Sequence, residues 1–226
     1  MKWLACLVFL SACDNSPSIS QEYPVEMSAL ASEGGSGLPY LAGNDLRPVW
    51  NLAAENLQPR KLLSFSLRDQ QGKAVELDYL KDKIGIVSFF FSKCPGVCPL
   101  TTKNLRKIQE KFKSDSRVVM LSLSITPESD TPGVLQNFAK KNAIEYQKWR
   151  LLTGGRKEIY DLARNSFSAD TFSARENSRG KLSDKDFLHS ENIYLIDNEQ
   201  RLRGVYAGAR LDSIDDLARD AQTLLK

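Results

Sequence analysis

The chain has few side chains with which to bind a soft metal or exchange electrons: its 226 residues include one histidine and four cysteines. It also lacks a marked excess of charge, because 31 Lys and Arg residues face 28 Asp and Glu residues, giving a formal net charge of +3 at pH 7. This balance gives no indication of a nucleic acid partner. No internal repeat of roughly 20 to 50 residues is apparent. Nor is any apolar run of about 20 residues, the length that spans a bilayer, apparent in the sequence. The composition therefore indicates one domain of ordinary size.

The N-terminus indicates export. Lys2 precedes the apolar run WLACLVFLSA, which is too short to span a bilayer but typical of a signal peptide. The run ends in LSAC, which resembles the lipobox of bacterial lipoproteins and implies cleavage before Cys13 and diacylation of its sulfur. An ordinary secretory signal is the alternative. In many Gram-negative lipoproteins an aspartate such as Asp14 implies retention in the inner membrane, so we expect an inner-membrane lipoprotein that faces the periplasm.

Composition divides the chain into four parts. Residues 1–12 form the signal peptide, and residues 13–43, which are poor in core residues and contain SEGGSG, are expected to form a flexible tether. Apolar residues return in residues 44–60, which we interpret as an arm packed on the domain. Residues 61–226 form the domain itself.

One stretch, residues 86–109, organises the domain. An apolar run rich in β-branched and aromatic residues leads into a turn that holds Cys94 and Cys98, and an amphipathic helix pattern follows. Pro95 and Pro99 each disfavour the α conformation in the residue before them. We therefore predict a tight turn between the cysteines, with Pro99 as the first helical residue.

The position of the two thiols indicates a reactive pair. At the start of a helix, backbone N–H groups and the helix dipole favour negative charge, so the pKa of at least one thiol should be lowered. The alternative is a structural disulfide, since spacing alone does not separate a staple from a site. Once Cys6 has left with the signal peptide and Cys13 carries lipid, Cys94 and Cys98 are the remaining thiols. A bridge closing so short a loop would add less than the roughly 3 kcal/mol expected for a loop of about 15 residues, which disfavours the staple.

The remaining patterns predict an α/β fold. Strands are expected at 63–67, 75–77, 84–91, 117–125, 149–152, 192–197 and 201–208, and helices at 99–112, 132–142 with Thr131 as N-cap, 157–165 and 211–225. This order is thioredoxin-like: an N-terminal hairpin, a central mixed sheet flanked by helices, and the dithiol at the end of the first central strand, where open α/β sheets place their sites. A long polar insertion near 166–186 is expected to be a functional loop or disorder.

The single histidine, His189, precedes the strand of the final hairpin, where its side chain is within reach of the dithiol. A lone histidine is more often a satisfied surface or core residue. Two thiolates and an imidazole nevertheless suit Cu(I), with Cu(II) possible through the nitrogen and a further oxygen ligand. Zinc would require a fourth ligand.

Three ordered motifs resemble the signatures of the Sco/SenC family: FFFSKCPGVCPLTTKNLRKIQEKF, LSLSITPESDTPGVLQNFAKK and FLHSENIYLIDNEQRLRGVYAG. With the arm LPYLAGNDLRPVW, the resemblance covers about residues 38–226. It implies a thioredoxin-like fold that binds copper through Cys94, Cys98 and His189. It further implies delivery of copper, or of reducing power, to the dinuclear copper site of cytochrome c oxidase. The implied partners are the subunit carrying that site or another copper chaperone, and we expect a monomer.

The chain departs from the family pattern at three positions. Gly96, Leu188 and Thr126 stand where many members have Asp, so three carboxylates are missing around the site. Two functions of different classes follow. One is a metallochaperone that carries copper, and the other is a thiol:disulfide oxidoreductase that reduces its partner's cysteines through Cys94 and Cys98. His189 favours the first function, and the loss of acids favours the second.

The lipobox yields a prediction about anchoring. Because a serine cannot accept the thioether-linked lipid, Cys13→Ser should release the protein from membranes or leave it unprocessed. Membrane fractionation and gel migration measure the effect. A variant that fractionates and migrates as the wild type does would exclude lipidation.

Overall fold

A seven-stranded mixed sheet forms the centre of this computed structural model, which describes residues 37–169 and 191–226. The strand order is β4-β3-β7-β6-β5-β8-β9. The strands are β3 (Ser66–Asp69), β4 (Ala74–Glu76), β5 (Ile84–Phe90), β6 (Val118–Ser124), β7 (Trp149–Thr153), β8 (Asn192–Ile196) and β9 (Leu202–Ala207). The pairs β5·β6 and β6·β7 are parallel, and the other pairs are antiparallel. The expected α/β architecture with a central mixed sheet is confirmed.

The two central strands, β5 and β6, are buried along their whole length, as their continuous apolar runs predict. Each nevertheless carries a serine near its middle. The Ser88 and Ser122 hydroxyls lie 2.7 Å apart, and Trp149 Nε1 donates to Ser122 Oγ at 2.8 Å. These polar groups hydrogen-bond to one another inside the core, so neither serine hydroxyl is buried without a partner.

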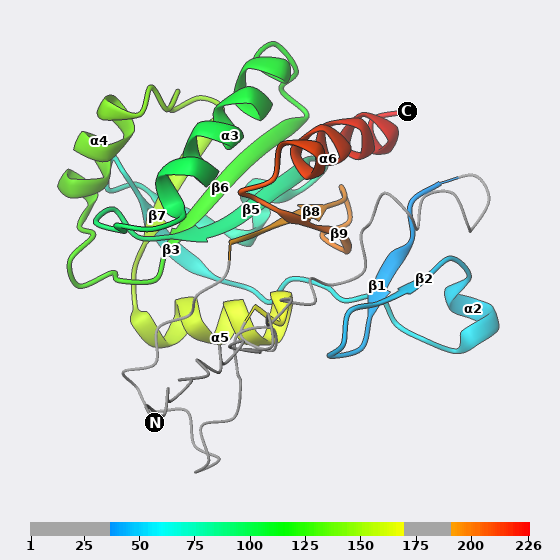
Figure 1. Ribbon diagram of the computed structural model, residues 1–226. Coiled ribbons are helices and arrows are strands. Elements are labelled where there is room, and N and C mark those ends of the chain that lie inside the picture. The colour runs from blue at the N-terminus through cyan, green and yellow to red at the C-terminus, as the bar shows by residue number, and fades with distance from the viewer. Residues whose placement is uncertain (1–36, 170–190) are drawn as a thin grey trace, which may run out of the picture.

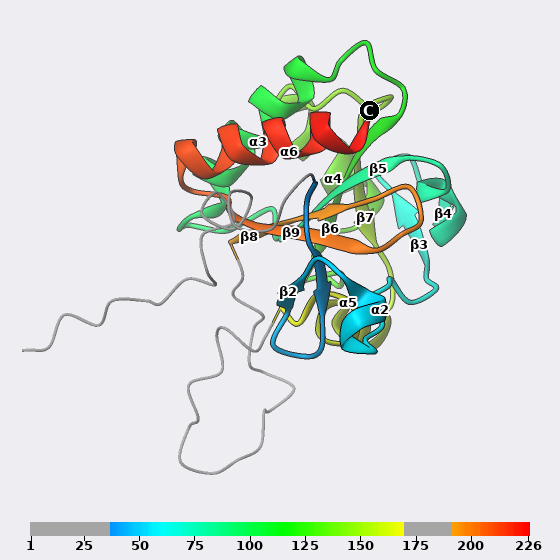
Figure 2. The same ribbon diagram turned by 90° about the vertical axis from the view of Figure 1, so that its right-hand side faces the viewer.

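Helices cover both faces of the sheet (Figure 1). The helices α3 (Cys98–Lys111), α4 (Pro132–Lys141) and α6 (Leu211–Leu224) lie on one face, and α5 (Arg156–Phe167) lies on the other. The view turned by 90° shows α3 and α6 side by side (Figure 2). Helix α4 begins as predicted, because Thr131 Oγ1 accepts a hydrogen bond from the Val134 N–H. The parallel strands β5 and β6 end at the same edge of the sheet. Helices α3 and α4, which follow them in the chain, begin there.

Helix α5 extends two residues further than predicted. Its last residue, Phe167, was assigned to the polar insertion but is fully buried. Its ring centroid lies 5.4 Å from that of Phe89 and 4.8 Å from that of Tyr194. Ser168 then ends the helix in the left-handed conformation. The insertion therefore begins after an aromatic anchor in the core, and its residues 170–190 lie outside the described part of the chain.

The first hairpin is shifted relative to the prediction, with strands at 66–69 and 74–76 rather than at 63–67 and 75–77. Its first strand begins at Ser66 rather than Leu63, because the Leu63 N–H donates to Ser166 Oγ and the Leu62 N–H to the Gln200 carbonyl. Leu77, expected at the end of the second strand, instead begins a 3₁₀ helix, η1 (Leu77–Leu80). Backbone groups bonded to other segments cannot also pair within the hairpin.

The arm begins earlier than predicted. It contains β1 (Tyr40–Ala42), β2 (Arg47–Val49) and α2 (Leu52–Glu55). Residues 37–43 were assigned to the tether, yet Leu41 is 2% exposed. The buried guanidinium of Arg203 on β9 explains the difference, because it donates to the carbonyls of Leu38 and Pro39 and lies 4.1 Å from the Tyr40 ring centroid. The signal peptide, Cys6, Cys13 and the rest of the tether lie outside the described residues. None of the helices described is both long and apolar enough to cross a membrane.

Candidate metal centre

The two cysteines lie on the turn that joins β5 to α3. The Cys94 N–H donates to the Phe91 carbonyl at 3.2 Å, which closes a turn directly after the strand. Cys98 is the first residue of α3, one residue earlier than predicted, so Pro99 occupies the second position. Both thiols are free and half-buried. The sequence-predicted dithiol is therefore formed at the edge of the sheet where β5 and β6 end.

The two thiols have opposite pKa shifts. Burial raises the pKa of Cys94, but hydrogen bonds from the Cys98 thiol and from the N–H groups of Cys98, Gly96 and Val97 outweigh burial, so the pKa lies below the ordinary value. For Cys98, burial first, and then the hydrogen bond and charge of Cys94, raise the pKa to about 12. Cys94 is therefore the more easily deprotonated of the two half-buried thiols, and Cys98 keeps its proton to higher pH, an arrangement that suits nucleophilic attack by Cys94 and proton donation by Cys98.

A buried carboxylate, Asp130, ties the dithiol turn to the loop after β6. It is 1% exposed and accepts hydrogen bonds from Ser92 N at 3.1 Å and Ser92 Oγ at 2.5 Å. It also accepts from Ser124 Oγ at 2.6 Å and Thr126 Oγ1 at 3.2 Å. These four bonds satisfy the carboxylate without a cation. This role of Asp130 was not predicted, although the residue lies in the second motif that resembles the family and next to the N-cap of α4.

The described part of the chain resumes at Glu191, at the same edge of the sheet. His189 lies outside the described residues, but Glu191 lies within them, and the Gly208 N–H donates to its carbonyl at 3.0 Å. A Cβ at Gly208 would lie 2.6 Å from that carbonyl and 2.6 Å from Cγ2 of Thr101, one turn after Cys98. Glu191 therefore lies beside the first turns of α3. Two further residues of chain span at most about 7 Å.

The described residues supply only part of a metal site. In residues 37–169 and 191–226, no group of three or more His, Cys, Asp or Glu side chains could hold a metal ion. The two thiols are a soft donor pair suited to Cu(I), which accepts thiolate ligands readily. A complete three-coordinate site needs one further ligand. The two described donors, the thiols of Cys94 and Cys98, therefore fit copper.

These features define a thioredoxin-like protein with a dithiol at the start of a helix. The SCO1/SenC family model matches residues 53–226, and the chain belongs to this family. A SCO1/SenC family lipoprotein from Bacillus anthracis is 28% identical, with a TM-score of 0.63 over 74% of this chain and 95% of that one. BsSco, a member of the Sco family of cytochrome c oxidase assembly proteins in which a disulfide switch was identified, is 27% identical, with a TM-score of 0.61 over 74% and 95%. ScoI from Arabidopsis thaliana, solved with copper bound, is 28% identical, with a TM-score of 0.54 over 71% and 98%.

The opposite pKa shifts predict unequal reactivity. In reduced protein, alkylation of Cys94 should reach half its maximal rate below the free-thiol pKa of about 8.5, while Cys98 stays unreactive there. Cys98→Ala should raise the half-maximal pH, because it removes the thiol hydrogen bond. Mass spectrometry of alkylated peptides across pH measures both rates, and mild oxidation should give an intramolecular Cys94–Cys98 bridge. Equal reaction of the two thiols, or intermolecular dimers only, would contradict this assignment.

The Asp130 network predicts a positioning effect with a definite sign. Asp130→Asn replaces one accepting oxygen by a donor, so Ser92 loses part of its anchor and the turn should present the Cys94 thiolate less well to its N–H donors. Cys94 alkylation should slow about threefold or more, the effect of roughly half a pKa unit. Loss of the negative charge alone would instead speed it. Asp69→Asn, at a buried carboxylate of the β3–β4 turn, is the control, because it should destabilise the fold without changing Cys94 reactivity.

Proposed function

We propose that this protein is a copper-binding metallochaperone for assembly of the dinuclear copper site of cytochrome c oxidase, with Cys94, Cys98 and His189 as ligands. The observation that carries the proposal is the hydrogen bond from the Gly208 N–H to the Glu191 carbonyl, next to Thr101 of α3, because Glu191 follows His189 by two residues in the sequence. The dithiol supplies two soft ligands, and an imidazole supplies a third. Copper bound to ScoI from Arabidopsis thaliana supports the choice of metal.

The protein's own residues control loading. Cys94 is the more acidic thiol, so it loses its proton first, whereas Cys98, whose pKa is raised, must lose its proton when copper binds. Copper is the cargo here, and what it requires of the chain is a pair of anionic sulfurs. Asp130 holds the start of the dithiol turn in place, because it accepts two hydrogen bonds from Ser92. Because the turn is fixed at both ends, by Asp130 and by α3, the thiols are preorganised for a single ion.

The proposed location is the periplasmic face of the inner membrane, with lipid on Cys13 as the anchor. The LSAC motif supports the lipid anchor, and the family protein from Bacillus anthracis is also a lipoprotein. An anchored domain would meet a membrane-bound oxidase subunit more often than a freely diffusing one, because the tether raises its effective concentration at the membrane.

A second candidate function, thiol:disulfide oxidoreductase, is favoured by the separation of the two thiol pKa values. The Cys94 thiolate would attack one sulfur of a partner disulfide and release the other as a thiolate. Cys98 would then lose its proton and attack Cys94 Sγ, which closes the Cys94–Cys98 disulfide and releases the second thiolate. Two electrons pass from this dithiol to the partner. The disulfide switch of BsSco agrees with such chemistry.

The variant His189→Ala separates the two functions. Under the chaperone function, reduced wild type binds one Cu(I) per chain, and the variant binds it at least tenfold more weakly if the imidazole contributes more than about 1.4 kcal/mol. Disulfide exchange should change little, since the imidazole takes no part in it. Competition with a chromogenic Cu(I) chelator measures affinity, and Ser190→Ala controls for changes in the same segment.

Two results would overturn the chaperone proposal. One is a His189→Ala variant that binds copper as the wild type does while the oxidase still matures, which would favour the reductase function. The other is copper binding by oxidised protein, because a Cys94–Cys98 disulfide removes both anionic donors.

A further inference from the structure

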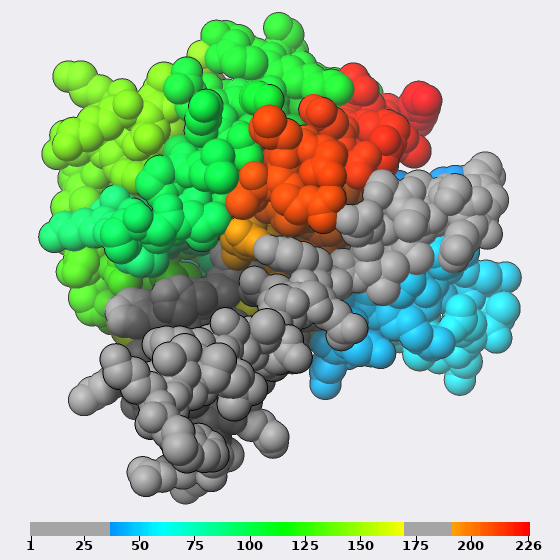
Figure 3. All heavy atoms as spheres, in the orientation of Figure 1, coloured from blue at the N-terminus to red at the C-terminus, as the bar shows by residue number. Residues whose placement is uncertain are grey.

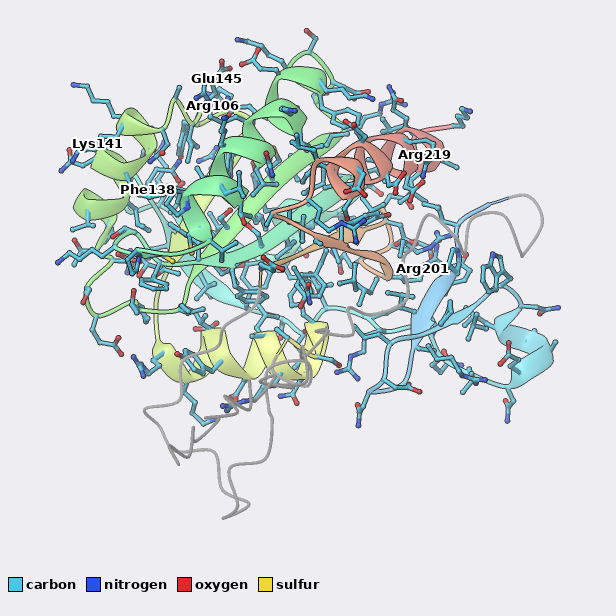
Figure 4. All side chains as sticks on the ribbon, viewed as in Figure 1. Arg106, Phe138, Lys141, Glu145, Arg201 and Arg219 are labelled. Atoms are coloured by element: carbon cyan, nitrogen blue, oxygen red, sulfur yellow. The ribbon has the colours of Figure 1, made fainter. Side chains whose placement is uncertain are left out.

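The edge of the domain that carries the dithiol also carries unpaired positive charge. Lys93 precedes Cys94 in the turn, and Lys103, Arg106 and Lys107 lie on the outer side of α3. All four side chains are exposed, and none pairs with a carboxylate in the structure described here. Arg106 projects outward from α3 (Figure 4). Positive charge therefore extends from the thiols along about two turns of helix.

Exposed apolar side chains gather at the same edge. Four large apolar side chains of the described residues are exposed, and three of them, at 38%, 45% and 51%, belong to this edge: Val97, Leu100 and Leu211. The first two flank Cys98. The third begins α6, directly after β9, whose last residue Ala207 pairs with the first residue of β8. The surfaces of α3 and α6 adjoin in the space-filling view (Figure 3).

Among the described residues, few carboxylates lie near the thiols. The three residues between the cysteines carry no acid. In the loop after β6, Glu128 is neutralised by Arg156 at 2.9 Å, and Asp130 is buried. Neither of these carboxylates offsets the four cations, and Glu191, beside the first turns of α3, offsets at most one of them.

We propose that this surface docks an acidic region of a partner protein that carries its own cysteines. The surface comprises three apolar and four basic side chains and is called the thiol face below: Val97, Leu100, Leu211, Lys93, Lys103, Arg106 and Lys107. This inference rests on the proposed function, because it assigns the charge of the partner at that same site. The apolar side chains supply contact area beside the thiols. The cations supply attraction at a distance and suppress basic competitors.

Charge and chemistry together favour a protein over a lipid surface. Anionic lipid headgroups would also attract the four cations. A bilayer seated on Val97 and Leu100, however, would cover the half-buried thiols and offer them no sulfur with which to exchange an electron pair or a metal. A protein with an acidic rim around its cysteines satisfies the cations and the thiols at once.

The test uses three disulfide-bridged peptides that are identical except for flanking residues of glutamate, serine or lysine. Reduced wild type should reduce the glutamate peptide about tenfold faster than the serine peptide, and the lysine peptide more slowly still, in 0.01 M salt, where the Debye length is about 30 Å. In 1 M salt, where it is about 3 Å, the three rates should converge. Ratios of rates cancel any change in the reactivity of Cys94 itself.

Charge reversal on the thiol face should invert the order. The double variant Lys103→Glu/Lys107→Glu should reduce the lysine peptide faster than the glutamate peptide. Lys81→Glu/Lys226→Glu is the matched control, because it makes the same change in net charge at the start of β5 and at the C-terminus, on the opposite edge of the sheet. That variant should keep the wild-type order.

Binding of peptides with serine in place of both cysteines, measured by fluorescence anisotropy, reads the thiol face without the chemistry. The glutamate peptide should bind most tightly. If no peptide is reduced while this ranking holds, the oxidoreductase function fails and the docking proposal stands. Equal binding of the three peptides, or an equal effect of the control variant, would overturn the docking proposal. So would loss of sedimentation with phosphatidylglycerol vesicles in Lys103→Glu/Lys107→Glu without any change in peptide ranking, since the cations would then serve the membrane.

Discussion

The parallel pairing of β5 with β6 is the constraint on which the site depends. It sets Phe90 opposite Ser124, so the dithiol turn and the loop after β6 leave the sheet side by side. In this register, Asp130 bonds Ser92 and Ser124 with one carboxylate. A buried carboxylate without these donors would destabilise the fold, so the network favours the conformation in which the two loops lie side by side. The position of the thiols is thus fixed from the sheet outward.

Local signals in the sequence predicted the parts of the fold that local forces determine. The fully buried strands β5 and β6 follow from continuous apolar runs, and the start of α4 follows from Thr131 and the proline after it. The dithiol turn was predicted to within one residue for the same reason. Its reactivity also follows from position, because the N–H groups at a helix start are present whatever the rest of the fold does.

The parts that were predicted incorrectly depend on partners distant in sequence. Residues 37–43 have a tether-like composition, but Arg203, more than 160 residues away, bonds their carbonyls. Phe167 is the last residue of α5 and precedes a polar insertion, yet its contacts with Phe89 and Tyr194 bury it. The Asp130 network requires two parallel strands to be paired before its donors and acceptors meet. No periodicity within one segment carries that information.

The unequal protonation of the two thiols links the two candidate functions. Between the pKa of Cys94 and that of Cys98, the reduced pair carries one negative charge, and binding of a metal by both sulfurs releases one proton. The same retained proton makes Cys98 a poor competitor when Cys94 attacks a disulfide, and its removal closes the bridge. Loading of copper onto both sulfurs and transfer of electrons to a partner disulfide would therefore both require deprotonation of Cys98. Burial is the largest cause of the raised pKa of Cys98. A partner that covers or opens the turn would therefore change the pKa of Cys98 and, with it, both proposed functions.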